Sequence, residues 1–167
     1  MASRALVFVA LLLASVGCDQ ATKRLAIERL EGAPPISLVG DTVRFELRAN
    51  TGGFLSLGAG LPAPLQRVVF VGLVPLVLLV VCALALRAGP LSAQAVAGLG
   101  LVAGGGLGNW LDRVREAGAV TDFVSVGLGG LRTGVFNGAD VAIVVGIVLL
   151  AFTRSGPASE RNAAPGA

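Results

Sequence analysis

Long apolar stretches separated by short polar links dominate the pattern of this chain. Residues 68–86 form an uncharged run bounded by Arg67 and Arg87, and its length is that of a membrane-spanning helix. A second uncharged run covers 88–111, and a largely apolar third covers about 133–153. With the apolar N-terminal run, the pattern predicts four helices, at about 4–26, 66–86, 91–111 and 134–153.

The polar segment between the first two helices has a different pattern. Residues 28–64 include a Pro34–Pro35 pair, and apolar and polar residues alternate from 42 to 48, which indicates a β-strand. We therefore expect an all-α integral membrane protein of four transmembrane helices, with a small β-rich subdomain at about 28–64 between helices 1 and 2. Residues 1–153 form one domain, and 154–167 form a disordered tail of Ala, Pro, Gly and polar residues.

Composition agrees with a membrane protein and narrows the chemistry. Of 167 residues, 54% are hydrophobic and only 14% are charged, whereas soluble domains carry about 25% charged residues. The chain has no His, which excludes His-based catalytic triads and His-ligated zinc or haem. Its two cysteines, Cys18 and Cys82, indicate neither a disulfide framework nor a four-ligand metal site. Any catalysis must therefore use carboxylates, amides, hydroxyls or the side chains of Lys and Arg.

The first helix allows a second interpretation. Arg4 and the apolar run 5–16 also fit a cleavable signal sequence, and residues 15–18 resemble a lipoprotein processing site ending at Cys18. The first position of that site lacks the usual Leu, and three more spans follow, so we favour a retained helix.

The positive-inside rule would place both termini outside, with four Lys and Arg on their side and nine on the other. Charge alone does not settle the topology.

Polar residues gather at the helix ends nearest the 28–64 segment. Their spacings of three and four residues place each group on one helix face, and antiparallel helices bring the groups to one membrane side. The groups are Asp19 with Lys23, Asn109 with Asp112 and Arg113, and Asn137 with Asp140. Charges at this level can simply reach the headgroups and pair, as Asp112 could with its neighbour Arg113.

Asp122 and Asp140 differ from Asp19 and Asp112 because neither has an obvious local counter-ion. Two carboxylates brought together at a poorly hydrated interface share a proton, since both cannot ionise cheaply. Such a pair can activate water and protonate a leaving amine, as in aspartic proteases. Solvation at helix ends and an ion-coupling site are the alternatives, and the sequence alone does not show that the two residues meet.

Five motifs in order resemble those of lipoprotein signal peptidase, also called signal peptidase II. They are DQATK at 19–23, NTGGF at 50–54, GGGLGNWLDR at 104–113, VTDF at 120–123 and FNGAD at 136–140. The resemblance covers about residues 5–153. It implies a bacterial inner-membrane aspartic endopeptidase that removes signal peptides from diacylglyceryl-modified prolipoproteins, cutting immediately before the lipidated Cys. It also implies cytoplasmic termini and a site near the extracytoplasmic face.

By this resemblance, Asp122 and Asp140 are the catalytic pair. The residues that bind substrate or brace the site are Asp19, Lys23, Asn50, Gly52, Gly105, Asn109, Asp112, Arg113, Asn137 and Ala139. The resemblance implies no metal or organic cofactor. The expected partners are the lipidated prolipoproteins and membrane lipid, with no nucleic acid. We expect the chain to be a monomer.

Two departures from the family pattern concern the loops. Gly53 stands where the family usually has Ala, before Phe54 of the extracytoplasmic loop, and the segment 125–135 is less aromatic than expected. Two alternatives from other classes stay open. One is a small ion-coupled carrier that uses Asp19, Asp122 and Asp140 as proton sites, and the other is a lipoprotein anchored at Cys18.

Overall fold

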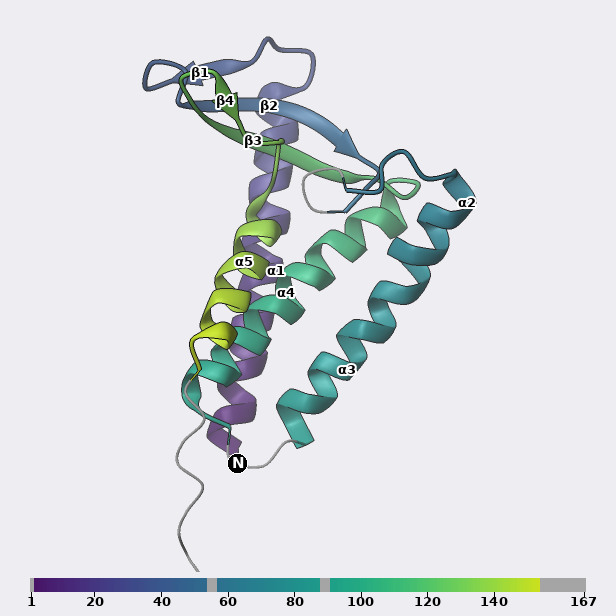
Figure 1. The fold of residues 1–167 in the computed structure, drawn as a ribbon, viewed down its shortest axis with the longest axis vertical. Coiled ribbons are helices and arrows are strands. Elements are labelled where there is room, and N and C mark those ends of the chain that lie inside the picture. The colour runs from purple at the N-terminus through teal and green to yellow at the C-terminus, as the bar shows by residue number, and fades with distance from the viewer. Residues whose placement is uncertain (1, 54–56, 88–90, 154–167) are drawn as a thin grey trace, which may run out of the picture.

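The computed structural model describes residues 2–53, 57–87 and 91–153 of the chain. Helices form a bundle with a small sheet across one end (Figure 1). The helices are α1 (Ala2–Leu30), α2 (Ala63–Gln66), the π-helical η2 (Arg67–Leu73), α3 (Val74–Arg87), α4 (Ala93–Arg115) and α5 (Gly138–Ala151). The strands are β1 (Ile36–Leu38), β2 (Val43–Asn50), β3 (Val120–Leu128) and β4 (Leu131–Arg132). Phe54, the 88–90 link and the predicted 154–167 tail lie outside the described residues.

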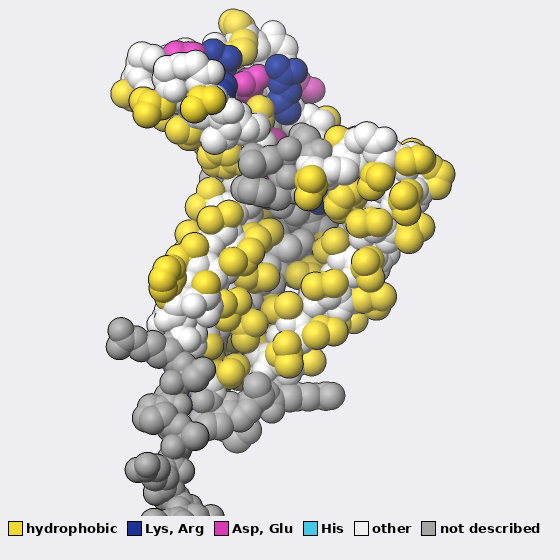
Figure 2. All heavy atoms as spheres, viewed as in Figure 1, with side chains coloured by type: hydrophobic (Ala, Val, Ile, Leu, Met, Phe, Trp, Pro, Cys, Tyr) yellow, Lys and Arg dark blue, Asp and Glu magenta, His cyan; other side chains and the backbone are white. Residues whose placement is uncertain are grey.

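The four predicted helices are present with shifted ends. The first extends to Leu30, four residues beyond its predicted end, and the second is the continuous run α2–η2–α3. Within the described ranges, Ser3–Leu30 and Ala63–Leu86 are long and apolar enough to cross a membrane, and Gly138–Ala151 is a shorter apolar helix. Apolar side chains cover the visible helix surfaces, whereas charged side chains gather around the sheet (Figure 2).

Helix α4 lies at the centre of the bundle and packs against α1, α3 and α5. Glycines make these contacts close: a Cβ on Gly98 would lie 2.8 Å from the Gly146 carbonyl oxygen of α5, and one on Gly104 would lie 2.7 Å from the Leu12 carbonyl oxygen of α1. Since lipid tails are as apolar as side chains, close packing of small residues holds helices together in membranes. The glycines of α4 thus set the distances at which α1 and α5 present their polar residues.

The sheet draws its strands from two separate segments of the chain, which corrects the prediction. The strand order is β1-β2-β3-β4 and every pair is antiparallel. β1 and β2 lie between α1 and η2 as expected, but β3 and β4 follow α4, so the β-rich part is not confined to 28–64. The run around Asp122 has the composition of a strand. Its partner strand, β2, lies far from it in the sequence and meets it only in the folded chain.

The join between β3 and α5 corrects the predicted start of the last helix. Residues 134–136 are not helical, because the Phe136 N–H and carbonyl pair with Val124 of β3. α5 begins only at Gly138, where Asn137 caps it: the Asn137 side chain accepts the Asp140 N–H, and the Asp140 side chain accepts the Asn137 N–H. This reciprocal cap satisfies N–H groups that a helix start leaves free. It also fixes Asp140 beside the sheet.

Candidate active site

Asp122 lies on β3 with its carboxylate held by two amide donors. The side chain is 1% exposed. Asn50 Nδ2, at the end of β2, donates to Oδ2 at 2.9 Å, and Asn137 Nδ2 donates to Oδ1 at 2.6 Å. The strand register places Arg48 opposite Asp122 and Asn50 opposite Val120. The pairing of β2 with β3 therefore brings Asn50 to this carboxylate.

Asp140 approaches the same place from the first turn of α5. Asn109 Nδ2 of α4 donates to Asp140 Oδ1 at 2.9 Å, and the Asn137 N–H donates to Oδ2 at 3.3 Å. Asn137 Nδ2 also donates to Asn109 Oδ1 at 3.0 Å. Two linked amides thus connect the carboxylates of Asp122 and Asp140.

Both carboxylates line one cavity of about 200 Å³, together with Asn109, Arg113 and Phe70. Among the ion pairs of the described residues, none involves Asp122 or Asp140. The structure thus brings Asp122 and Asp140, which the sequence alone did not place together, to one cavity. Apolar side chains from η2, α3 and α5 also line the cavity: Phe70, Val74 and Ile143.

Burial changes the acidity of Asp122, which lies in the sheet outside the helices. Removal from water raises the pKa of this carboxyl to about 6; the charge of Asp140 adds to the rise, and the hydrogen bonds from Asn50 and Asn137 oppose it. A carboxyl with a pKa in this range exchanges protons near neutral pH, as general acid–base catalysis requires. Within the described part of the chain, no group of three or more His, Cys, Asp or Glu is arranged to hold a metal ion.

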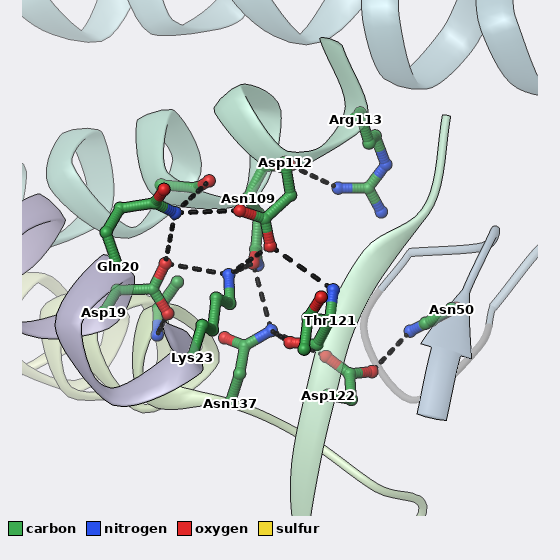
Figure 3. A network of polar contacts seen from close by, with 12 residues as sticks. Asp19, Gln20, Lys23, Asn50, Asn109, Asp112, Arg113, Thr121, Asp122 and Asn137 are labelled. Atoms are coloured by element: carbon green, nitrogen blue, oxygen red, sulfur yellow. Dashed lines mark hydrogen bonds and ion pairs between the residues drawn. The ribbon is translucent and has the colours of Figure 1, made fainter. Parts of the chain in front are cut away.

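A buried ion cluster supports the site from the α1 side (Figure 3). Lys23 Nζ lies 2.8 Å from Asp19 Oδ2 and 2.8 Å from Asp112 Oδ2, and it donates to Asn109 Oδ1 at 2.9 Å. The expected pair of Asp19 and Lys23 is present. Asp112, however, pairs with Lys23 and not with its neighbour Arg113, because the i, i+1 spacing turns the two side chains to different faces of α4.

Arg113 instead reaches the loop after β2. Its guanidinium donates to the Gly52 carbonyl and to the Asn109 carbonyl at 3.1 Å, and lies 5.1 Å from the centre of the Phe70 ring. The Gly52 N–H in turn donates to Asn50 Oδ1 at 2.9 Å. Arg113 thus ties the loop that follows Asn50 to α4.

Gly105 and Ala139 bring α4 and α5 together. A Cβ on Gly105 would collide with the Ala139 carbonyl oxygen, so only glycine permits this approach. Ala139 is completely buried, and its N–H donates to Asp19 Oδ1 at 2.9 Å. Both residues position the polar groups around them and offer no reactive atom of their own.

Some residues of the site were not predicted. Gln20 donates to Asp112 Oδ1 at 2.8 Å, and the Thr121 N–H donates to Asp112 Oδ2 at 3.3 Å. Phe70 forms part of the cavity wall. Gln20 belongs to the DQATK motif, which could have indicated it, whereas nothing in the apolar run around Phe70 distinguishes that residue from lipid-facing ones.

Structural comparison identifies the fold. The fold matches that of two solved bacterial membrane enzymes, determined by the in meso method at 2.3 and 1.9 Å resolution. The TM-scores are 0.69 and 0.72, each at 20% sequence identity over 90% of this chain; the matches cover 85% and 91% of the solved chains. The chain therefore shares the fold of these two solved membrane enzymes, and its two carboxylates line one cavity at the sheet.

Sequence comparison identifies the family. The family model for signal peptidase (SPase) II matches residues 11–154, and the chain belongs to this family. It is 41% identical over 137 residues to the lipoprotein signal peptidase of Rhodococcus jostii, a match covering 79% of this chain and 64% of that protein. It is 35% identical over 147 residues to that of Streptomyces griseus, covering 83% and 69%. The carrier alternative is not favoured by these relatives.

Proposed function

We propose that this chain is a membrane aspartic endopeptidase. It cleaves the signal peptide from diacylglyceryl-modified prolipoproteins immediately before the lipidated cysteine. One observation carries the proposal: in a member of the signal peptidase II family, Asp122 and Asp140 line one buried cavity and are linked through Asn109 and Asn137.

The proposed chemistry needs one proton on the carboxylate pair. The ionised carboxylate takes a proton from water as the water oxygen attacks the scissile carbonyl carbon, and the protonated carboxyl gives its proton to the carbonyl oxygen. The tetrahedral intermediate then collapses: the amine of the lipidated cysteine takes the proton of one carboxyl as the C–N bond breaks, and a hydroxyl of the intermediate gives its proton to the other carboxylate as the carbonyl re-forms, which restores the single proton on the pair. The amide donors of Asn50, Asn109 and Asn137 hold the two carboxyl groups in place for both steps.

The same proposal includes the placement of the chain in the membrane. Four helices, α1, α2–η2–α3, α4 and α5, cross the bacterial inner membrane as one domain over residues 1–153, with both termini cytoplasmic and the sheet at the extracytoplasmic face. The apolar helix surfaces and the charged sheet end support this arrangement (Figure 2). The proposal takes the chain to act as a monomer.

Lipidation of the substrate acts as a positional tag in this scheme. A diacylglyceryl group partitions into lipid with about 0.8 kcal/mol per buried CH₂. The bilayer therefore holds the modified cysteine at the depth of the sheet, beside the cavity. An unmodified precursor lacks this restraint and should be cleaved more slowly.

The experiment is cleavage of a synthetic diacylglyceryl-modified prolipopeptide by the purified chain. Asp122→Asn and Asp140→Asn should each lower turnover by about 100- to 10,000-fold while substrate binding is kept. The matched control is Asp41→Asn, because Asp41 pairs with Arg44 and Arg132 in the sheet, outside the cavity. Full turnover in either Asp122→Asn or Asp140→Asn would remove that residue from the chemistry, and a folded wild-type chain without cleavage would refute the proposed function.

A further inference from the structure

The second helix departs from α-helical geometry beside the site. Seven residues, Arg67–Leu73, form the π-helical η2, and the Val74 N–H donates to the Val69 carbonyl, five residues earlier. Such stretches are rare and are often found at functional sites. The cause lies in the sequence: Pro75 has no N–H to offer Val71, four residues before it, and its ring would clash with the Val71 carbonyl in an α-helix.

Trp110 supplies a donor to that carbonyl. Its indole Nε1 on α4 donates to the Val71 oxygen at 3.0 Å. Backbone carbonyls in a membrane helix need a partner inside the protein, because lipid offers none. Trp110 is the only tryptophan in the chain. One side chain therefore joins α4 to η2 at the point where Pro75 removes the regular hydrogen bond.

The residue next to Val71 is part of the cavity. The Phe70 ring lines the cavity with Asp122 and Asp140, and the Arg113 guanidinium lies over it. The ring also approaches the loop after β2, since a Cβ on Gly53 would lie 3.3 Å from its Cε1 atom. The turn of η2 that Trp110 holds thus sets the position of one wall of the cavity.

We infer that Trp110 is a positioning residue for the proposed peptidase: its hydrogen bond to the Val71 carbonyl holds η2 so that Phe70 stays against Arg113 and shapes the substrate cavity. Trp110 does not line that cavity. The inference rests on the proposed function. A positioning role differs from a purely structural role, because loss of a positioning residue weakens substrate binding and does not lower the amount of folded enzyme.

The test is Trp110→Phe, which removes the N–H donor and keeps an aromatic ring, assayed on the lipidated prolipopeptide. The loss of one neutral hydrogen bond changes an equilibrium constant by about 2- to 12-fold. We expect KM to rise by that factor. The value of kcat should be unchanged, since the hydrogen bonds of Asp122 and Asp140 are untouched. In a Phe70→Leu background the same substitution should have no further effect. Phe8→Leu, a core change in α1, is the control and should lower thermal stability without changing KM.

The outcomes separate the two proposals. An unchanged KM in an active Trp110→Phe enzyme, or a fall in kcat alone, would overturn the positioning role and leave the proposed function standing. A folded wild-type chain that cleaves nothing would overturn the proposed function and this inference with it. If Trp110→Phe does not fold, replacement of Trp110 by benzothienylalanine, which has the shape of tryptophan without the N–H, gives the same measurement.

Discussion

Replacement of Lys23 by Met should show how far the buried ion cluster stabilises the protein. Lys23 is 3% exposed and lies 2.8 Å from carboxylate oxygens of both Asp19 and Asp112. Met keeps the apolar stem and removes the charge, so two buried carboxylates lose their cation. Breaking a buried ion pair by removing one partner costs about 3–5 kcal/mol.

The assay is thermal unfolding of the purified chain in detergent. At about 2–4 °C per kcal/mol for a chain of this size, the Tm of Lys23→Met should fall by roughly 6–20 °C. The neighbouring Arg24→Met is the matched control: Arg24 is exposed on the same helix, so the change should stay within about 0.5 kcal/mol. Adding Asp112→Asn to Lys23→Met should recover part of the loss. Equal Tm values for Lys23→Met and Arg24→Met would refute the reasoning.

Two further predictions concern helix packing and pH. Gly105→Ala should destabilise the chain by about 1–3 kcal/mol, because its Cβ would collide with the Ala139 carbonyl oxygen. The control is Gly17→Ala, where a Cβ meets no atom within 4 Å; it should be neutral or stabilising by up to about 1 kcal/mol. Chemical denaturation of the two variants measures both changes in the free energy of unfolding. The raised pKa of Asp122 favours the folded state when this carboxyl is protonated, so its contribution to stability should fall as the pH rises from about 4 to 6. Tm profiles over that range should be flatter for Asp122→Asn than for wild type, and parallel profiles would contradict the assignment.

The glycines of the central helix α4 determine where the polar residues of its neighbours lie. Each close contact of α4 removes the space for a side chain, as at Gly98 against α5 and Gly104 against α1. A larger residue at these positions would move α1 or α5 outward. Asp19 on α1 and Asp140 on α5 would move with them, so the packing of small residues and the geometry of the polar site are one property.

Local patterns were enough to predict the helices and the polar groups. A bilayer demands about twenty apolar residues for each crossing, so the apolar runs in the sequence indicated the helices directly. Spacings of three and four residues placed Asn109 with Arg113, and Asn137 with Asp140, on common helix faces. The five motifs indicated the family from the sequence alone, and the family model confirms it.

Contacts between distant segments were not predictable in the same way. Lys23 pairs with Asp112 across 89 positions only because α1 and α4 touch. The sheet was assigned to one loop because neither segment alone encodes the pairing of β2 with β3, which lie far apart in the chain. Phe70 and Trp110 look like lipid-facing residues in the sequence, and their roles depend on the geometry of η2.

The sequence by itself determined that this is a helical membrane protein of the signal peptidase II family, with Asp122 and Asp140 as its candidate catalytic pair. These conclusions follow from hydrophobic length, helical spacing and motif order, which are local properties of the chain. The tertiary structure decided which groups hold the two carboxylates: Asn50 through the pairing of β2 with β3, Asn109 through α4, and Asn137 through the cap of α5. Such contacts depend on how separate elements pack, which no local pattern encodes.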